Sequence, residues 1–225
     1  MNHLNINKQL ISFNKDNEHD KYEDIINDLS NNKKIALISD AGTPGISDPG
    51  HVLIKACIKN NIQTQSLPGA TAFVPALVNS GLDTTNFTFY GFLKNRNEKK
   101  KQELSKVLSL NSTIILYESP FRVIETLKFI DELYPNRTLC VAREISKIHE
   151  EYLYGTASQI IPKVTEKGEF VIIIDKSEIN TVDFSNLTLD EHYNYYKLQG
   201  FNKKEIIKKI VKVKLLMTRL RPFTS

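Results

Sequence analysis

The chain has 225 residues, of which 40% are hydrophobic and 25% charged, and this is the composition of a globular protein with a sizeable core. No run of about 18 apolar residues occurs, and the opening MNHLNINKQL lacks the order of a signal peptide, so we expect a cytoplasmic protein without a membrane span. The net charge of +4 is modest, but Lys and Arg cluster in KNRNEKKK (94–101) and again after residue 202. Such clusters are either solvated helix faces or surfaces that attract phosphate.

The first half of the chain alternates expected helices and strands. Apolar spacing predicts helices over 20–29, over 51–60 and up to about residue 80, and strands at 34–39 and 63–67. This order favours a parallel sheet. The β-rich stretch NFTFYGF (86–92) then leads into a hydrophilic segment, 93–101, which we interpret as a linker or an exposed loop.

The second half repeats the alternation. The expected strands are 113–117, 138–142, 149–154 and 169–175, and the expected helices are 97–108, 120–133, a short one before the last strand, 189–198 and 203–216. Two α/β lobes fit this pattern better than one continuous sheet. We therefore divide the chain into an N-terminal α/β lobe (1–92), a C-terminal α/β lobe (93–178) and a helical tail (179–225).

The two cysteines do not indicate a metal site. Cys57 falls in an expected helix and Cys140 in an expected strand, and neither has a CxxC partner or a nearby His. We interpret both as buried thiols and predict no bound metal.

A long loop, SDAGTPGISDPG (39–50), follows the first expected strand. A turn of two or three residues would suffice there, so the length suggests a shaped binding surface. Its glycines allow close backbone approach and its prolines stiffen it, which predicts a fixed cradle of main-chain groups. The loop lacks the G-x-G-x-x-G order and the lysine of a phosphate loop, so a neutral or zwitterionic ligand stays open. The alternative is a structural crossover in which Asp48 caps the next helix.

Three further motifs also follow expected strands. LPGATAF (67–73) is a second glycine turn, which we expect beside the first loop unless it is an ordinary helix start. In YESPFR (117–122), Glu118 either faces a crevice or satisfies helix N–H groups. AREISKIHEE (142–151) is either a functional charge cluster or a solvated salt-bridge surface.

These motifs and KGEFVIII (167–174), in this order and spacing, closely resemble the ribosomal RNA small subunit methyltransferase I family of the tetrapyrrole methylase superfamily. The resemblance covers about residues 12–175. It implies two α/β lobes with the cofactor, S-adenosylmethionine, in a cleft between them, and usually a homodimer. It also implies methylation of the 2′-hydroxyl of a cytidine ribose in the decoding region of 16S rRNA, within the small ribosomal subunit.

The resemblance also implies site residues. The residues expected to touch the cofactor are Asp40, Gly42, Thr43, Pro44, Pro68, Gly69, Ala70, Thr71 and Tyr117. Glu118, Glu144 and Lys147 are the catalytic candidates for helping the ribose hydroxyl lose its proton. Arg122 and Arg143 are the candidates for holding flanking phosphates of the RNA.

Two departures from the family pattern leave other functions open. The family begins with a strand and a TPIGN-like turn that are not found here, and without that central strand we expect unpaired strand edges in the first lobe. Phe121 stands where the family commonly has His, and its ring is suited to stacking on a base. The alternatives are an inactive, truncated RNA-binding or interaction protein and a methyltransferase with a non-RNA substrate.

Overall fold

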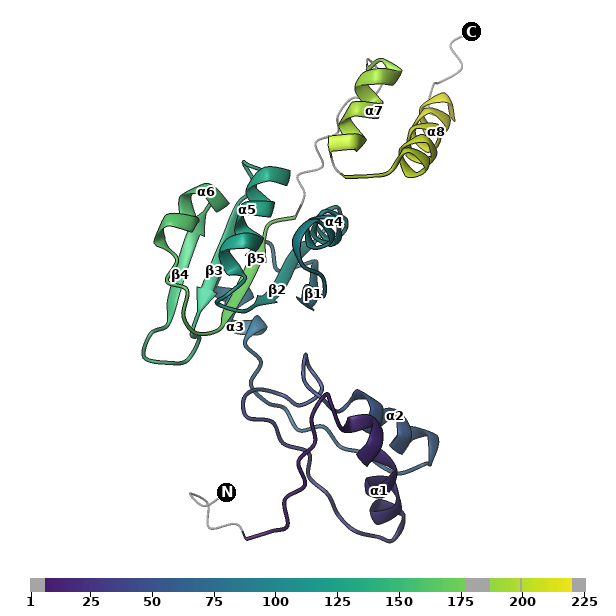
Figure 1. The fold of residues 1–225 in the computed structure, drawn as a ribbon, viewed down its shortest axis with the longest axis vertical. Helices are drawn as coiled ribbons and strands as arrows, with labels where there is room; N and C mark the ends of the chain where they lie inside the picture. Colours follow the sequence, from purple (N-terminus) through teal and green to yellow (C-terminus); the bar gives the residue numbers. More distant parts are fainter. Residues whose placement is uncertain (1–6, 177–186, 199, 220–225) are drawn as a thin grey trace. The chain divides into compact units, whose positions relative to one another are not determined.

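The computed structural model describes residues 7–176, 187–198 and 200–219, which divide into two compact units, Met1–Ala72 and Phe73–Ser225 (Figure 1). The first unit contains two helices, α1 (Glu18–Ser30) and α2 (His51–Lys59). They pack through a small core of three buried residues, Ile25, Leu53 and Cys57. The helices predicted over 20–29 and 51–60 are thus confirmed.

The strands predicted at 34–39 and 63–67 are wrong. No described residue of the first unit is assigned to a strand, so the parallel sheet expected there does not form. A strand is defined by hydrogen bonds to a neighbouring strand, and a sheet of only two strands is marginally stable in water. An apolar run such as KIALI therefore predicts a strand only where the fold supplies partners for it.

The second unit is built on a five-stranded sheet. Its strands are β1 (Phe87–Phe92), β2 (Thr113–Glu118), β3 (Leu139–Arg143), β4 (Glu151–Gly155) and β5 (Phe170–Ile174), in the spatial order β1-β2-β5-β3-β4. β1 pairs in parallel with β2, while β5 runs antiparallel to both β2 and β3. The carboxyl ends of β1, β2 and β3 therefore lie along one edge of the sheet, where β4 and β5 begin.

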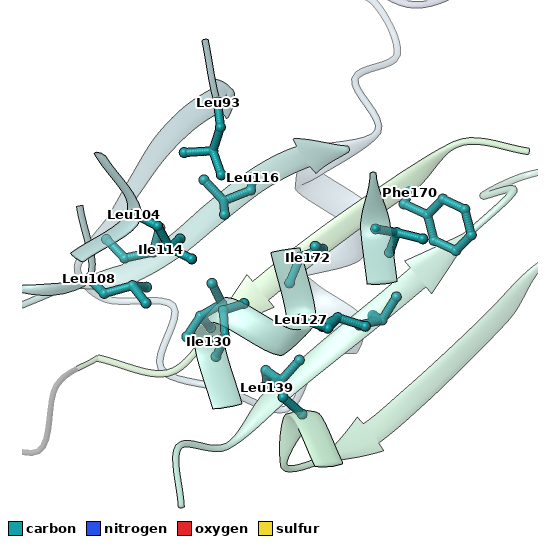
Figure 2. Packing of buried hydrophobic residues seen from close by; sticks show 14 of the residues in the cluster. Leu93, Leu104, Leu108, Ile114, Leu116, Leu127, Ile130, Leu139, Phe170 and Ile172 are labelled. Carbon is teal, nitrogen blue, oxygen red and sulfur yellow. The ribbon is translucent and has the colours of Figure 1, made fainter. Parts of the chain in front are cut away.

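Helices cover both faces of this sheet. The helices α4 (Asn97–Leu108), α5 (Val123–Leu133) and α6 (Ala157–Ile160) contribute side chains to the larger core, together with Ile114, Leu116, Leu139 and Ile172 of the strands (Figure 2). A 3₁₀ turn, Ile161–Lys163, follows α6. The short helix α3 (Phe73–Asn79) packs on the opposite face. Because β5 is covered on both sides, all five of its residues are buried, which explains its unbroken apolar sequence FVIII.

The compact units divide the chain between Ala72 and Phe73, and β1 belongs to the second unit because it pairs with β2. The expected lobe boundary at residue 92 stays a prediction. The helices expected over 189–198 and 203–216 are present as α7 (Leu189–Leu198) and α8 (Lys203–Arg219). The expected boundary at 178 and the last basic residue, Arg221, lie outside the described residues. The division into two lobes and a tail stays a prediction.

Both cysteines are buried, as predicted. Burial raises the pKa of the Cys140 thiol to about 12, which makes it an unreactive group. Within residues 7–176, 187–198 and 200–219, His, Cys, Asp and Glu form no group of three or more suited to a metal ion. In the same residues, no helix is both long and apolar enough to span a bilayer.

Candidate active site

The two glycine loops of the first unit lie side by side, as predicted. The hydroxyl of Thr43 donates a hydrogen bond of 3.1 Å to the carbonyl oxygen of Ala70. The hydroxyl of Ser39 lies 3.1 Å from the carbonyl oxygen of Ala41 and 3.0 Å from that of Gly42, which braces the first loop internally. Residues 40–42 and 68–70 are solvent-exposed, so their main-chain groups are open to a ligand.

The loops approach closely at Gly69. A Cβ there would lie 3.2 Å from the Thr43 hydroxyl, closer than most real contacts, so a side chain at this position would require Thr43 to shift by a few tenths of an ångström. Pro44 and Thr71, which follow Thr43 and Ala70 in the chain, are both half-buried. The alternative role of the first loop, with Asp48 as a helix cap, is not observed, because α2 has Gly50 at its N-cap and no side-chain cap bond.

Tyr117 lies at the end of β2, in the second unit. Its hydroxyl accepts a 3.2 Å hydrogen bond from the backbone N–H of Phe73, the first residue of α3. Its ring makes edge contacts with Phe89 and Phe92 of β1. Tyr117 therefore fixes the start of α3, which follows the second glycine loop directly in the chain.

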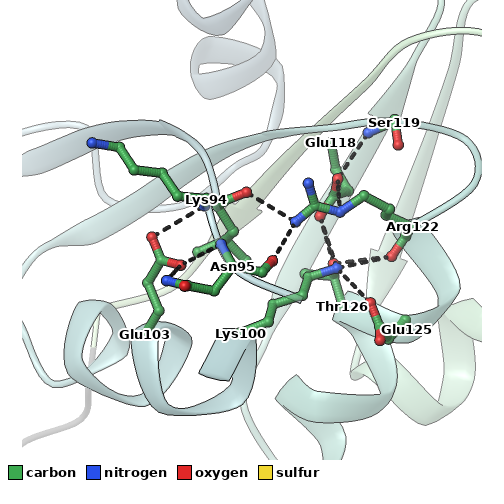
Figure 3. Close-up of polar contacts among 10 residues, drawn as sticks. Lys94, Asn95, Lys100, Glu103, Glu118, Ser119, Arg122, Glu125 and Thr126 are labelled. Atoms are coloured by element: carbon green, nitrogen blue, oxygen red, sulfur yellow. Dashed lines mark hydrogen bonds and ion pairs between the residues drawn. The ribbon is translucent and has the colours of Figure 1, made fainter. Parts of the chain in front are cut away.

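Glu118 is buried and fully engaged (Figure 3). One carboxylate oxygen accepts a hydrogen bond from the backbone N–H of Ser119 at 2.9 Å and lies 3.5 Å from Nε of Arg122. The other accepts from the Thr126 hydroxyl at 2.6 Å and lies 3.2 Å from Nζ of Lys100. Of the two alternatives stated for Glu118, a crevice-facing group or an acceptor for helix N–H groups, the geometry is nearer the second, because Glu118 accepts the N–H of Ser119 in the turn before α5 (Val123–Leu133).

Lys100 and Arg122 extend this buried cluster. The Lys100 ammonium is wholly buried, 2.9 Å from Glu125 and 3.4 Å from the carbonyl oxygen of Arg122. Nη2 of Arg122 donates to the carbonyl oxygens of Leu93 at 2.9 Å and Asn95 at 3.1 Å. Sequence reasoning missed Lys100 because it stands in a run of three lysines.

Of the segment 93–101, interpreted from the sequence as a linker or exposed loop, residues 94–96 form an exposed loop whose backbone is held by hydrogen bonds, and α4 begins at Asn97. The carboxylate of Glu103 accepts hydrogen bonds from the backbone N–H groups of Lys94 and Asn95, and from the Asn95 side chain (Figure 3). Tyr90, the bulged residue of β1, donates its hydroxyl to the same carboxylate at 2.7 Å. Burial alone would raise the pKa of Glu103, but these donors lower it to about 2.

Glu144 and Lys147 form a second charged group, after β3. Nζ of Lys147 lies 2.9 Å from Glu144 and 3.1 Å from Glu169, and the backbone N–H of Glu169 donates to the same Glu144 oxygen at 2.9 Å. The hydrogen bond to Lys147 lowers the pKa of Glu144, and the same bond raises the pKa of Lys147. Gly168 has φ +86° and a Cβ there would lie 2.5 Å from Glu144, so this packing requires glycine.

Arg143 and Phe121 complete the edge of the sheet. Nε of Arg143 donates to Glu151 at 3.0 Å, directly across the β3–β4 pair. Phe121 lies in the turn after β2 and is 92% exposed. The edge therefore carries internally paired charges, of which Glu118 is buried and Lys147 is exposed, beside the exposed ring of Phe121.

Comparison with known proteins identifies the family. Residues 6–161 match the family Tetrapyrrole (Corrin/Porphyrin) Methylases. The chain is 37% identical over 217 residues to ribosomal RNA small subunit methyltransferase I of Halalkalibacterium halodurans, covering 93% of this chain and 75% of that protein. The protein of the same name in Bacillus subtilis is 38% identical, covering 91% and 73%. This chain belongs to the ribosomal RNA small subunit methyltransferase I family of tetrapyrrole methylases.

Solved structures agree on the fold of this methyltransferase I family member. A diphthine synthase superposes with a TM-score of 0.58 at 12% identity, covering 75% of this chain and 70% of that one. Uroporphyrin-III C-methyltransferase from Thermus thermophilus, solved with S-adenosylhomocysteine, gives 0.52 at 12% identity, covering 76% and 78%. At this identity the likeness bears on the fold alone, and it agrees with the predicted α/β fold of the tetrapyrrole methylase type.

Proposed function

We propose that this chain transfers a methyl group from S-adenosylmethionine to the 2′-hydroxyl of a cytidine ribose in 16S rRNA of the small ribosomal subunit. The observation that carries the proposal is the 37% identity, over 93% of the chain, to a protein named ribosomal RNA small subunit methyltransferase I. We also propose that it acts in the cytoplasm as a homodimer, which the family resemblance supports and sedimentation of the purified chain would test.

The glycine loops fit the cofactor. S-adenosylmethionine has no phosphate, so exposed main-chain donors and acceptors suit it better than a phosphate-binding lysine. Gly69 approaches Thr43 so closely that a Cβ there would be a tight contact, as expected of loops that form a close cradle. In this proposal the cradle consists of Asp40, Gly42, Thr43 and Pro44 of the first loop, Pro68, Gly69, Ala70 and Thr71 of the second, and Tyr117.

The bound cofactor supplies an electrophilic methyl group, and the chain has to align the ribose oxygen and remove its proton. Of the three base candidates, Glu118 has both oxygens engaged in the buried cluster. Lys147 has a raised pKa and stays a cation at neutral pH. Glu144 uses one oxygen for its contacts, and the second has no hydrogen-bond partner within the described part of the chain. We therefore propose Glu144 as the base and Lys147 as the cation that orients it.

The test is transfer of tritiated methyl groups from S-adenosylmethionine into small ribosomal subunits that lack this modification, followed by mapping of the modified nucleotide. Glu144→Gln is expected to lower the transfer rate by about 100-fold, the range of lost general-base catalysis, with unchanged S-adenosylhomocysteine affinity. The matched control is Glu150→Gln in the same loop. Modification of a base rather than a ribose would overturn the 2′-hydroxyl assignment, and full activity of Glu144→Gln would remove it as the base.

A further inference from the structure

The basic run KNRNEKKK contains two kinds of cation. Lys100 and Lys101 are internal partners, since Lys100 is buried against Glu118 and Glu125, and Lys101 pairs with Glu132. The other three cations are Lys94, Arg96 and Lys99. All three are exposed, and within the described part of the chain their side chains make no hydrogen bond or ion pair. Figure 3 shows the Lys94 side chain extending away from the cluster.

The backbone beside Lys94 and Arg96 is held on two sides, while Lys99 lies in the first turn of α4. Arg122 binds the carbonyl oxygens of Leu93 and Asn95, and Glu103 binds the N–H groups of Lys94 and Asn95. Leu93 itself is only 1% exposed, so the segment is also anchored by its side chain in the core. A surface loop with this many fixed backbone groups loses little conformational entropy when it binds a ligand.

The location of the loop links it to the candidate base. It leaves the carboxyl end of β1, and β3, which ends beside Glu144, finishes at the same edge of the sheet. We propose that Lys94, Arg96 and Lys99 form a preorganised contact for the phosphate backbone of the RNA substrate. This inference rests on the proposed function, which names RNA as the partner, and it adds the protein surface that binds the RNA.

In this proposal Arg122 is a positioning residue. Its Nη2 donates hydrogen bonds to two carbonyl oxygens of the loop, and its Nε faces the buried Glu118. The guanidinium therefore holds the loop backbone against the core of the second unit. Arg122 thus contributes to RNA binding through the backbone of residues 93–95. This role differs from the direct phosphate contact expected from the sequence.

The binding test measures fluorescence anisotropy of a fluorescein-labelled single-stranded RNA from the decoding region, over a series of KCl concentrations. The loop variant carries Lys94→Gln, Arg96→Gln and Lys99→Gln. The control carries Lys106→Gln, Lys128→Gln and Lys163→Gln, three exposed lysines of the same unit with the same total change of charge. Each phosphate contact contributes about 0.7 to the slope of log affinity against log salt, so the loop variant is expected to lose a slope of about 2.

The control variant is expected to keep a slope close to that of the unmodified chain. Equal losses in the two variants would mean that net charge alone attracts RNA, and this would overturn the proposal. In the methyl-transfer assay the loop variant is expected to raise KM for the RNA and leave kcat unchanged.

A double-mutant cycle tests the role of Arg122. Arg122→Lys keeps the charge but not the paired carbonyl contacts, so it is expected to weaken RNA binding about fivefold, with an unchanged salt slope and unchanged S-adenosylhomocysteine affinity. In the background of the loop variant it is expected to add nothing. An independent additional loss would show that Arg122 contacts RNA itself. If circular dichroism shows Arg122→Lys to be unfolded, Glu103→Gln perturbs the same loop from the other side and is read by the same criteria.

The two proposals fail in distinguishable ways. Salt-dependent RNA binding through the loop without any methyl transfer would contradict the proposed function and leave this inference standing. Methyl transfer by the unmodified chain, with identical RNA binding by the loop and control variants, would contradict this inference alone.

Discussion

The two units of the chain hold their proposed site residues in different ways. In Met1–Ala72, exposed glycine loops are joined by one hydroxyl-to-carbonyl hydrogen bond and lie next to a core of three buried residues. In Phe73–Ser225, the corresponding residues end the strands of a sheet that is packed on both faces, and a buried ion cluster braces them. Local stability follows the density of buried contacts, so the first unit is expected to open more readily.

This difference suits the tasks proposed for the two units. A loop that depends on few internal contacts gains order when a ligand binds to it, whereas a surface that reads a large polyanion benefits from being fixed beforehand. The predictions below test whether the ion cluster stabilises the second unit, and whether the cofactor stabilises the first.

The largest effect is expected from Lys100→Met, which leaves the Glu118 carboxylate buried with Arg122 as its nearest cation, at 3.5 Å. Removing one partner of a buried ion pair costs about 3–5 kcal/mol of unfolding free energy. Urea denaturation of the whole chain measures this loss. The control is Lys99→Met, an exposed neighbour for which a change within about 0.5 kcal/mol is expected.

The double variant Lys100→Met with Glu118→Gln sharpens this test. It removes the unpaired charge, so it is expected to recover part of the stability that Lys100→Met loses. A cost below about 1 kcal/mol for Lys100→Met alone would show that the cluster is not a main support of the second unit.

The next largest effect is stabilisation of the first unit by the cofactor product. At a concentration 100 times its Kd, S-adenosylhomocysteine is expected to stabilise the state that binds it by about 2.7 kcal/mol. Amide hydrogen exchange should show the gain at residues 39–50 and 68–71 rather than in β5, whose amides lie in the core of the second unit. Equal protection of both regions would contradict the contrast between the units.

A smaller effect is expected from Thr43→Val, which removes the hydroxyl that binds the carbonyl oxygen of Ala70. One neutral hydrogen bond contributes about 0.5–1.5 kcal/mol, so S-adenosylhomocysteine should bind about two- to tenfold more weakly by calorimetry. Thr43→Ser keeps the hydroxyl and should bind nearly as the unmodified chain does. Equal affinities for the Val and Ser variants would show that this hydrogen bond does not shape the cradle.

Most helices and all strands of the second unit could be predicted from the sequence because their periodicity is local. The 97–108 helix and the apolar run of Phe170–Ile174 are examples, and both are present as expected. The strands predicted at 34–39 and 63–67 are wrong for a non-local reason, since a strand depends on partner strands that the local sequence does not reveal.

The site residues show the same division between local and distant information. The contact between the two glycine loops was predicted from an expected parallel sheet, and the contact is observed although that sheet does not form in the described part of the first unit. The burial of Lys100 was not predicted, because a charged residue is normally assigned to an exposed face. Lys100 nevertheless stands four and eight residues before Leu104 and Leu108, on the buried face of α4. Its partner Glu118 lies on another element, and only the tertiary fold brings the two together.

The smallest effect expected is a pH dependence of the local stability that Glu103 gives to the loop through its hydrogen bonds with Lys94, Asn95 and Tyr90. It would show where the second unit opens most readily. The folded-state pKa of Glu103 is lowered to about 2, so the stability it contributes is present above its ordinary pKa of 4.5 and lost as the pH falls from there toward 2. The hydrogen bond to Glu103 raises the pKa of Tyr90 to about 12, so its contribution is lost as the pH rises from 10 toward 12.

Amide exchange at residues 94 and 95 at pH 3 and pH 7 measures the acid side of this dependence. Exchange, corrected for its intrinsic pH dependence, should increase at pH 3 in the unmodified chain, because below its ordinary pKa of 4.5 Glu103 takes up a proton when the loop opens, and this favours opening. Tyr90→Phe should make this increase smaller, since the loss of its hydroxyl donor brings the folded-state pKa of Glu103 closer to its ordinary value. Glu98→Gln, on an exposed side of the same helix, should leave the profile unchanged. An identical profile for Tyr90→Phe would mean that the two backbone donors and Asn95 alone hold Glu103 ionised, so that the bulged residue of β1 does not contribute to fixing the RNA-facing loop.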